Sequence, residues 1–426
     1  MKALTLLVVT FALSTLSCSI ENALVASAPQ LGAFENASPI FRDALRQIEK
    51  NPDSPAAHTS LAMLYMKESR KTGDFSLNAK AESAVSRALE ISPGDATARK
   101  LRASLHLANH RFTQAVEAAT ALRDEFPGDP FIYGVLADAY IEIGQYENAV
   151  EASQKMVDLK PGTASYSRVA QLRTLYGDHR GALEMFTKAA RSADPTDKET
   201  QSWCLVQLGD EYWKAGNYAE AERIYDEALE NFPGYFFATV SKGRLRASLG
   251  DYETAERLLT EVQIPGPNAK AMLMLGDIYT VRGDADRARK QYEAFEAFEK
   301  DLGDAADHNR LALSLVDRGR VDEALPIARK EYANEPSIYS ADLLAWCLYK
   351  TGDTQEAKRY MREAMRLKTR DARIWFHAGM IANADGDRRE AVRFLNAALA
   401  LNPGFDIARA REAGTVLASL RSRALR

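Results

Sequence analysis

One pattern of residues recurs along most of this chain at a nearly fixed interval, and its clearest copy is Leu205–Pro233. The first half of the pattern places apolar or small residues at i, i+3, i+4 and i+7, which is one face of a helix: Leu205, Leu208, Gly209 and Tyr212. The second half supplies a facing stripe: Ala221, Tyr225 and Ala228. Gly216 ends the first helix, and Pro233 cannot continue the second. The pattern therefore predicts a closely packed pair of antiparallel helices.

The interval between copies is given by the glycine that ends each first helix. These turn glycines are Gly144, Gly177, Gly216, Gly250, Gly283, Gly319, Gly352 and Gly386. Their successive spacings are 33, 39, 34, 33, 36, 33 and 34 residues, and earlier copies end at Pro93, Pro127 and Pro161. In the second copy, His110 takes the position of the turn glycine. A constant period of helical hairpins predicts repeats that stack side by side in a solenoid.

An aspartate follows the turn glycine in five copies: Asp178, Asp251, Asp284, Asp353 and Asp387. We interpret these carboxylates as N-caps of the second helices rather than as metal ligands. Two spacings depart from the period. The 39-residue step contains a polar loop at 192–200, and the 36-residue step predicts a second helix that continues to Gly303. In the first copy, extra residues near 67–78 are expected to separate the two helices.

The order of a large apolar residue, Leu, Gly and Tyr, then Ala, an aromatic residue and Pro resembles the tetratricopeptide repeat. The resemblance implies an all-α fold, a right-handed α-solenoid of about ten helical hairpins. We place the solenoid at residues 53–404, an N-terminal packing helix at 39–52 and a C-terminal capping helix at 405–426. The resemblance also implies that the chain binds other proteins, as peptide or helix segments, and has no catalytic site.

Composition and motifs support this interpretation. The formal net charge is −4, from 55 basic and 59 acidic residues, which gives no reason to expect nucleic acid as a partner. The chain has no phosphate-binding glycine loop, H-E-x-x-H, C-x-x-C or G-x-S-x-G motif. His106 and His110 are spaced as metal ligands on one helix face, but they occupy a packing position and a turn position of the repeat. We therefore expect no metal, cofactor or small-molecule substrate.

The N-terminus has the features of an export signal. Lys2 precedes a largely apolar run at 3–16, too short to span a bilayer comfortably, so residues 1–17 are predicted to be a signal peptide. The Thr-Leu-Ser-Cys sequence resembles a bacterial lipoprotein box, which implies lipidation of Cys18 and a tether at 18–38. Ser19 favours the outer membrane, with the protein facing the periplasm. The alternative is a soluble periplasmic protein whose signal peptide is cut near Ala28.

The stripe two residues ahead of the packing stripe must face away from it, and in tetratricopeptide-like arrays that stripe lines the concave groove. The candidates are Phe131, Asp138 and Ile141 in the third repeat; Trp203, Val206, Asp210 and Trp213 in the fifth; Tyr339, Asp342, Trp346 and Tyr349 in the ninth; and Arg373, Phe376, Met380 and Asn383 in the tenth. Exposed aromatic residues in a groove are typical of binding hot spots. The alternative is that adjacent first helices bury these rings.

Two functions remain open. The first is a non-enzymatic protein–protein interaction scaffold of the bacterial cell envelope, which assembles or regulates a secretion, pilus or polymer-export machine. The second is the binding or regulatory subunit of an enzyme complex whose catalytic subunit is a separate chain.

Overall fold

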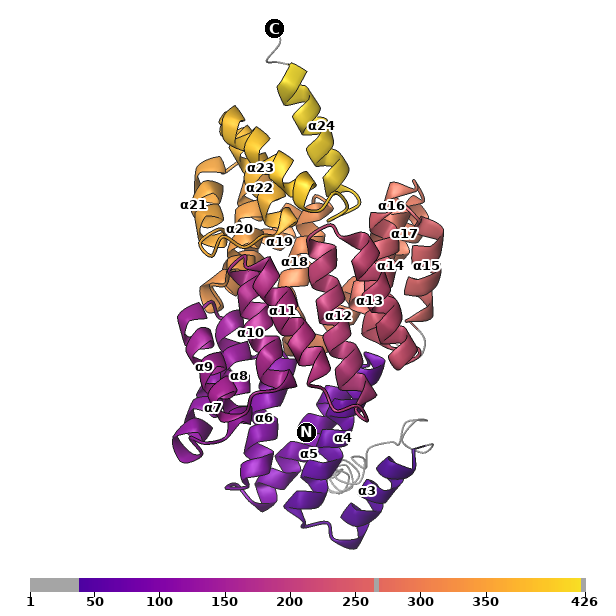
Figure 1. Cartoon of the computed structure of the whole chain (residues 1–426), viewed down its shortest axis with the longest axis vertical. Coiled ribbons are helices and arrows are strands. Elements are labelled where there is room, and N and C mark those ends of the chain that lie inside the picture. Colours follow the sequence, from indigo (N-terminus) through magenta and orange to yellow (C-terminus); the bar gives the residue numbers. More distant parts are fainter. Residues whose placement is uncertain (1–37, 264–267, 423–426) are drawn as a thin grey trace, which may run out of the picture.

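The computed structural model describes residues 38–263 and 268–422, and all regular secondary structure in these two ranges is helical. Helix α3 (Pro39–Lys50) precedes ten antiparallel helical hairpins, and α24 (Arg409–Ser422) follows them. The predicted all-α solenoid is confirmed (Figure 1). The predicted signal peptide, the lipidation site Cys18 and most of the tether lie outside the described residues.

Each repeat contributes a first and a second helix, which pack on each other and on the next repeat. The first helices are α4 (Pro55–Thr72), α6 (Ala96–Ala108), α8 (Pro130–Glu142), α10 (Thr163–Leu175), α12 (Lys198–Lys214), α14 (Phe236–Ser248), α16 (Ala269–Val281), α18 (His308–Asp317), α20 (Ile338–Lys350) and α22 (Ala372–Ala384). The second helices are α5 (Leu77–Ile91), α7 (Phe112–Glu125), α9 (Tyr146–Leu159), α11 (His179–Arg191), α13 (Tyr218–Asn231), α15 (Tyr252–Glu261), α17 (Ala285–Leu302), α19 (Val321–Asn334), α21 (Thr354–Ala364) and α23 (Arg388–Leu401).

The turns have the chemistry that the sequence predicts. Asp178 accepts a hydrogen bond from the Gly181 backbone N–H at 2.9 Å, and the aspartates of the other four Gly-Asp turns cap their helices in the same way. His110 has φ of 54°, the left-handed conformation that glycine adopts elsewhere in the series. These aspartates therefore act as N-caps of the second helices, and this role accounts for their recurrence after the turn glycines.

The departures from the period are accommodated in different ways. Helix α17 is 18 residues long and ends at Leu302 with Gly303 as its C-cap, in agreement with the continuation that the 36-residue spacing predicts. The extra residues of the first repeat were expected to separate its helices, and this prediction is wrong for most of them. They lengthen α4 instead, which runs for 18 residues to Thr72 and leaves only a short turn before α5. A helix satisfies its own backbone hydrogen bonds, so added residues are absorbed without a long loop.

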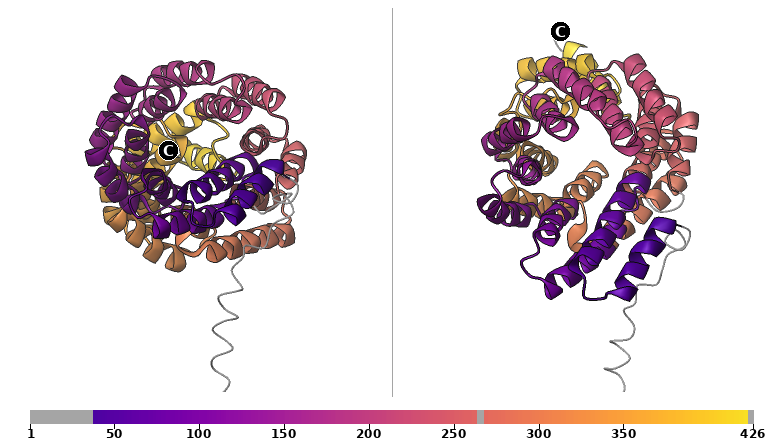
Figure 2. Two further views of the ribbon diagram at one scale, coloured as in Figure 1. Left: turned by 90° about the horizontal axis from the view of Figure 1, so that it is seen from below. Right: turned by 60° about the horizontal axis from the view of Figure 1, so that its bottom comes forward.

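The superhelix coils tightly enough for its later repeats to contact its earlier ones. The backbone N–H of Ile338 donates to the Tyr146 hydroxyl at 2.8 Å, and Arg366 donates to the Gly144 carbonyl at 2.9 Å. Ser248 donates to the carbonyl of Gly404, also at 2.8 Å. The helices consequently form a ring around a common axis, seen end-on in Figure 2. We call this line of contacts between repeats 3–6 and repeats 8–10 the seam.

Turn glycines lie directly on the seam. A Cβ atom at Gly144 would lie 2.2 Å from the Pro336 carbonyl oxygen, whereas a Cβ at Gly352 would meet nothing within 4 Å. Both glycines have positive φ, at 72° and 88°. Two features therefore require glycine at position 144. One is its left-handed backbone conformation, and the other is the close approach of the Pro336 backbone across the seam.

The chain leaves the tenth repeat through residues 402–408, which we call the crossing segment. The Gly404 N–H donates to the Tyr218 hydroxyl at 2.7 Å, and Ile407 packs into the core cluster of repeats 6 and 7. The expected capping helix from residue 405 therefore begins later, at Arg409, and then packs on α22 and α23. Among the helices of residues 38–263 and 268–422, none combines the length and apolar character that a membrane-spanning helix requires.

Candidate functional site

Two adjoining cavities lie on the inner side of the superhelix, and we call them together the interior chamber. The larger has a volume of about 660 Å³ and is walled by α12, α14, α16 and α18, with contributions from α22, the crossing segment and α24. The smaller, of about 460 Å³, shares four wall residues with it: Arg244, Arg310, Leu313 and Arg373. Apolar side chains form part of the larger wall: Val206, Phe236, Phe237, Val240, Leu273, Met274 and Leu313.

Ion pairs between neighbouring elements cover much of the remaining wall. Arg244 contacts Asp210 at 2.6 Å, and its guanidinium lies 3.9 Å from the centre of the Trp213 ring. Burial by itself would raise the pKa of Asp210, but the Arg244 guanidinium, the hydrogen bond from the Tyr225 hydroxyl and other neighbouring groups together outweigh burial, and the pKa is lowered. Asp210 therefore stays ionised, and the pair joins α12 to α14 across the chamber wall.

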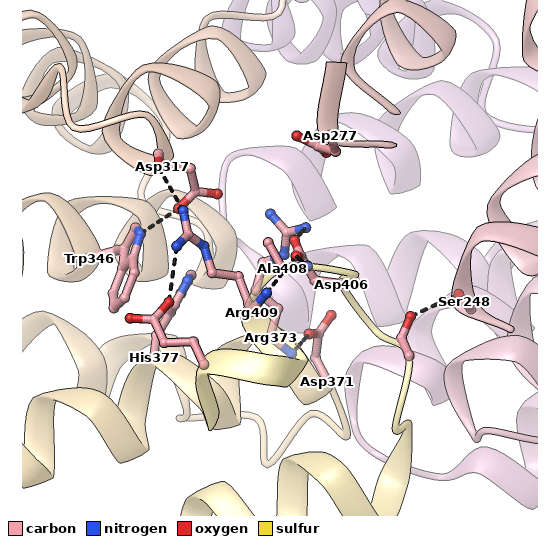
Figure 3. Close-up of polar contacts among 12 residues, drawn as sticks. Ser248, Asp277, Asp317, Trp346, Asp371, Arg373, His377, Asp406, Ala408 and Arg409 are labelled. Carbon is pink, nitrogen blue, oxygen red and sulfur yellow. Dashed lines mark hydrogen bonds and ion pairs between the residues drawn. The ribbon is translucent and has the colours of Figure 1, made fainter. Parts of the chain in front are cut away.

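The crossing segment and α24 continue this pattern. Asp406 pairs with Arg373 of α22 at 3.0 Å, and Arg409 pairs with Asp317 of α18 at 3.1 Å (Figure 3). Arg409 also donates to the Asp317 backbone carbonyl at 2.7 Å. Because these contacts join repeats 8 and 10 to the C-terminal end of the chain, the crossing segment closes one side of the chamber.

The predicted stripe does reach the chamber in the middle of the array. Val206 and Asp210 line the larger cavity, and Trp213, Tyr339 and Asp342 line the smaller one. Arg373 lines both, and Tyr339 has 43% of its surface exposed. In repeats 5, 9 and 10 these positions of the stripe therefore form part of the chamber walls.

Several of the predicted groove residues are buried. Trp346 and Phe376 are each 0% exposed and Met380 is 5% exposed, so the prediction that they face an open groove is wrong. The Trp346 ring stacks between Tyr349 and His377, with ring centres 4.9 and 4.1 Å away.

Two further contacts explain this burial. The Trp346 indole N–H donates to Asp317 of the preceding repeat at 2.9 Å, and Phe376 lies against Phe405 of the crossing segment with ring centres 5.8 Å apart. Adjacent first helices and the crossing segment therefore bury these rings. Burial between adjacent first helices was the alternative interpretation of the stripe.

The remaining candidates lie away from the walls of the two cavities. Phe131 is 42% exposed, and Asp138 pairs with Arg168 at 2.6 Å. Trp203 and Tyr349 are half-buried against the cores of repeats 4–5 and 8–10. Ile141 is buried and Asn383 is exposed. None of these six lines the interior chamber.

Repeats 6 to 8 contribute wall residues that were not among the predicted candidates: Phe237, Arg244, Lys270, Leu273, Asp277 and Leu313. These occupy the same stripe positions, so the period alone would have found them. A second overlooked signal is the separation of polar partners. Asp210 and Arg244 are 34 residues apart, and the buried pair of Asp342 with His377, at 2.9 Å, is 35 apart. Side chains about one period apart meet because they lie at equivalent or neighbouring positions of adjacent first helices.

Comparison with known proteins agrees with this geometry. Models described as tetratricopeptide repeat match residues 73–130, 206–270, 240–301, 273–337 and 342–404, and two further models of the same description match 163–234 and 106–176. The chain belongs to the tetratricopeptide repeat family. Tetratricopeptide repeats form protein–protein interaction scaffolds, so this chain has the fold of such a scaffold.

Two curated relatives share part of this tetratricopeptide array. Cellulose synthase 1 operon protein C of Komagataeibacter xylinus is 26% identical over 270 residues, which is 57% of this chain and 19% of that protein. The TPR repeat-containing thioredoxin TTL4 of Arabidopsis thaliana is 30% identical over 143 residues, 33% of this chain and 19% of that protein. The matched part of the chain thus spans about a fifth of the length of each relative.

Solved structures with similar helical repeats are more distant. Human IFIT1 with PPP-AAAA is 15% identical with a TM-score of 0.49, and the match covers 74% of this chain and 73% of that one. PilW, a type IV pilus biogenesis factor, is 18% identical with a TM-score of 0.38, over 48% of this chain and 93% of that one. Similarity at this level does not extend to what these proteins bind.

Proposed function

We propose that this chain is a non-enzymatic scaffold that binds a segment of a partner protein in the interior chamber. The observation that carries the proposal is the inward stripe of repeats 5 to 8, which lines a cavity of about 660 Å³ with both apolar and charged side chains. Binding sites with a few placed polar groups in an apolar wall typically have volumes of about 300–1,000 Å³.

The shape of the chamber favours a single segment over a folded domain. The seam joins the turns of the superhelix, and the crossing segment lies over one side of the chamber. A folded domain would have to separate these contacts, whereas one extended or helical segment fits without doing so. Apolar anchors would pack on Phe237, Leu273 and Leu313, while the ion pairs satisfy polar groups around them.

We also propose that the protein works in the bacterial cell envelope as a periplasm-facing lipoprotein, anchored through Cys18 and located at the outer membrane. The support is the apolar N-terminal run with its lipoprotein-like box. Cys18→Ser is expected to release the protein from the membrane fraction or to leave it unprocessed, because acyl chains dominate the membrane affinity of such a chain. Mass spectrometry of the mature N-terminus is the measurement, and an unlipidated start near Ala28 would contradict the proposal.

The partner would be a component of a secretion, pilus or polymer-export machine. Similarity to a protein named for a cellulose synthase operon favours the last of these, and it equally supports the second candidate function, a binding subunit of an enzyme complex. The two candidates differ in the partner. A catalytic chain captured in the chamber would favour the enzyme complex, and a chain without catalytic motifs would favour the structural scaffold.

Site-specific photo-cross-linking in cells tests the binding proposal. A benzophenone amino acid in place of Phe237, which lines the larger cavity, is expected to cross-link one partner that mass spectrometry can identify. The matched control is the same substitution at Val150, which is 43% exposed on α9. Equal cross-linking at both positions, or none at Phe237, would contradict a partner inside the chamber.

A further inference from the structure

Two charged side chains of the larger cavity wall differ from all the others. Within residues 38–263 and 268–422, Lys270 and Asp277 have no ion-pair partner. Every other charged residue of that wall is paired: Asp210 with Arg244, Arg310 with Glu299 and Asp307, Asp317 with Arg409, Arg318 with Glu296, and Arg373 with Asp406. The wall therefore offers one cation and one carboxyl group to an occupant.

These two groups have a fixed spacing because they belong to one helix. Lys270 and Asp277 are seven residues apart on α16, so they share a face and are separated by about 10 Å along the helix axis. Leu273 and Met274 lie between them on the same wall. Lys270 is exposed, and half-buried Asp277 accepts a hydrogen bond from the Tyr292 hydroxyl at 2.8 Å. The face thus presents a cation, an apolar patch and a carboxyl group in line.

Charges of both signs surround each group, and a like charge has the largest effect among them. Desolvation within the enclosed chamber and then the Arg310 guanidinium lower the pKa of Lys270, while the Asp210 and Asp307 carboxylates act in the opposite direction. At the other end of the face, burial and then the neighbouring Asp406 and Asp317 carboxyls raise the pKa of Asp277. An occupant with the opposite charge at each end would relieve both repulsions. Because the other charged groups of the wall are ion-paired, the unpaired groups are one cation near the start of α16 and one carboxyl group near its end.

We propose that Lys270 and Asp277 form a two-point clamp for a partner segment that carries a carboxylate and a cationic side chain about 10 Å apart, on either side of an apolar residue. In an extended segment this corresponds to acidic and basic residues about three positions apart, since a strand rises about 3.3 Å per residue. In a helical segment it corresponds to about seven positions. The clamp rests on the proposed function, and it specifies the partner's chemistry.

A partner with charges of one sign fits less well. An acidic segment would pair with Lys270 and leave a carboxylate facing the unpaired Asp277. A basic segment would pair with Asp277 and leave a cation facing the unpaired Lys270. Like charges in an enclosed site are strongly unfavourable, so the wall selects for an occupant of mixed charge.

Selection from a phage-displayed library of random 12-residue peptides tests the clamp on the full chain. Enriched peptides are expected to carry an acidic and a basic residue at one of the two spacings. A chain with Lys270→Gln and Asp277→Asn should lose that enrichment. The matched control, Lys300→Gln with Asp301→Asn, changes an exposed amine and carboxyl on α17 and should retain it. Each single chamber variant should weaken a selected peptide by about tenfold, the loss expected for one charge-assisted contact.

Three outcomes would overturn the clamp: enrichment of peptides of one charge sign, enrichment of uncharged apolar peptides, or the same enrichment on the double chamber variant as on the control. The photo-cross-linked partner separates this proposal from the one it rests on. If a partner cross-links at Phe237 but its segment lacks opposite charges at these spacings, the clamp proposal is contradicted and the scaffold proposal stands. If nothing cross-links at Phe237, the scaffold proposal is contradicted.

Discussion

At the scale of single residues, Trp346 shows that position in the repeat does not settle exposure. Its stripe position is the one that Asp210 and Asp277 occupy in the chamber wall, but its ring is fully buried between Tyr349 and His377. The period predicts which way a side chain leaves its helix. It does not predict whether a neighbour is large enough to cover that side chain, and this is why Trp346 and Phe376 were misplaced.

Trp346→Ala is therefore expected to destabilise the protein. Loss of a fully buried large aromatic side chain typically costs about 3–5 kcal/mol of unfolding free energy, which here should fall on repeats 8 to 10. Differential scanning calorimetry measures the effect. Tyr339→Ala is the control, because that side chain is 43% exposed and should leave the thermal transition nearly unchanged. A transition that Trp346→Ala does not shift would contradict its burial.

Asp277 should make stability depend on pH. Burial and the neighbouring Asp406 and Asp317 raise its pKa to about 7, while Arg373 acts in the opposite direction and Tyr292 donates a hydrogen bond to it. In the unfolded chain the pKa is about 3.9. Between these values the folded state holds more protons than the unfolded state, so this group reduces stability as pH rises from about 4 to about 7.

Asp277→Asn removes that penalty and keeps an acceptor for Tyr292. The variant is expected to melt about 2 °C above the wild type at pH 8, since 1 kcal/mol corresponds to a few degrees in a chain of this size. At pH 4 the difference should vanish. Burial also raises the pKa of Glu335 to about 8, so the variant should keep part of the pH dependence. A melting difference that is the same at both pH values would contradict a raised pKa at Asp277.

At the scale of elements, the helices and their caps were predictable because they depend on local chemistry. The Gly-Asp turns fix where each first helix ends and where the next begins, and the structure has both features at the expected residues. The crossing segment was not predictable. The sequence from Phe405 continues an amphipathic pattern, but Gly404 and Asp406 make contacts with Tyr218 and Arg373, which keep residues before Arg409 out of the helix.

Gly144→Ala and Gly352→Ala together measure the seam. Both place a Cβ at positive φ, which costs roughly 1–2 kcal/mol in each case. At Gly144 the Cβ would also lie 2.2 Å from the Pro336 carbonyl oxygen, whereas Gly352 faces open space. Gly144→Ala should therefore lose at least about 1 kcal/mol more stability in urea titration, a cost typical of overpacking.

Hydrogen exchange shows where that loss falls. Faster exchange at the Ile338 amide, which donates to Tyr146 across the seam, is expected in Gly144→Ala and not in Gly352→Ala. Identical stability and exchange in the two variants would contradict a close contact between Gly144 and Pro336 across the seam.

At the scale of the whole molecule, the closed coil is the feature least visible in the sequence. The seam joins residues such as Tyr146 and Ile338, 192 positions apart, through single hydrogen bonds and glycine contacts in loops. Such contacts have no period, and small changes in the angle between repeats accumulate along the array. The period therefore predicts a solenoid with an inward stripe, while the enclosure of that stripe in repeats 5 to 8 depends on the pitch of the superhelix.

The distance across the seam in solution tests the closed coil most directly. Spin labels at Gln145→Cys and Asn334→Cys, both exposed positions near the contact of Gly144 with Pro336, would report it by double electron–electron resonance in a chain carrying Cys18→Ser. Cys204 and Cys347 are fully buried, and burial raises their thiol pKa to about 11 and about 12, so they should escape labelling. The structure predicts one short, narrow distance distribution. A long, broad distribution would describe an open superhelix and would contradict the enclosed chamber.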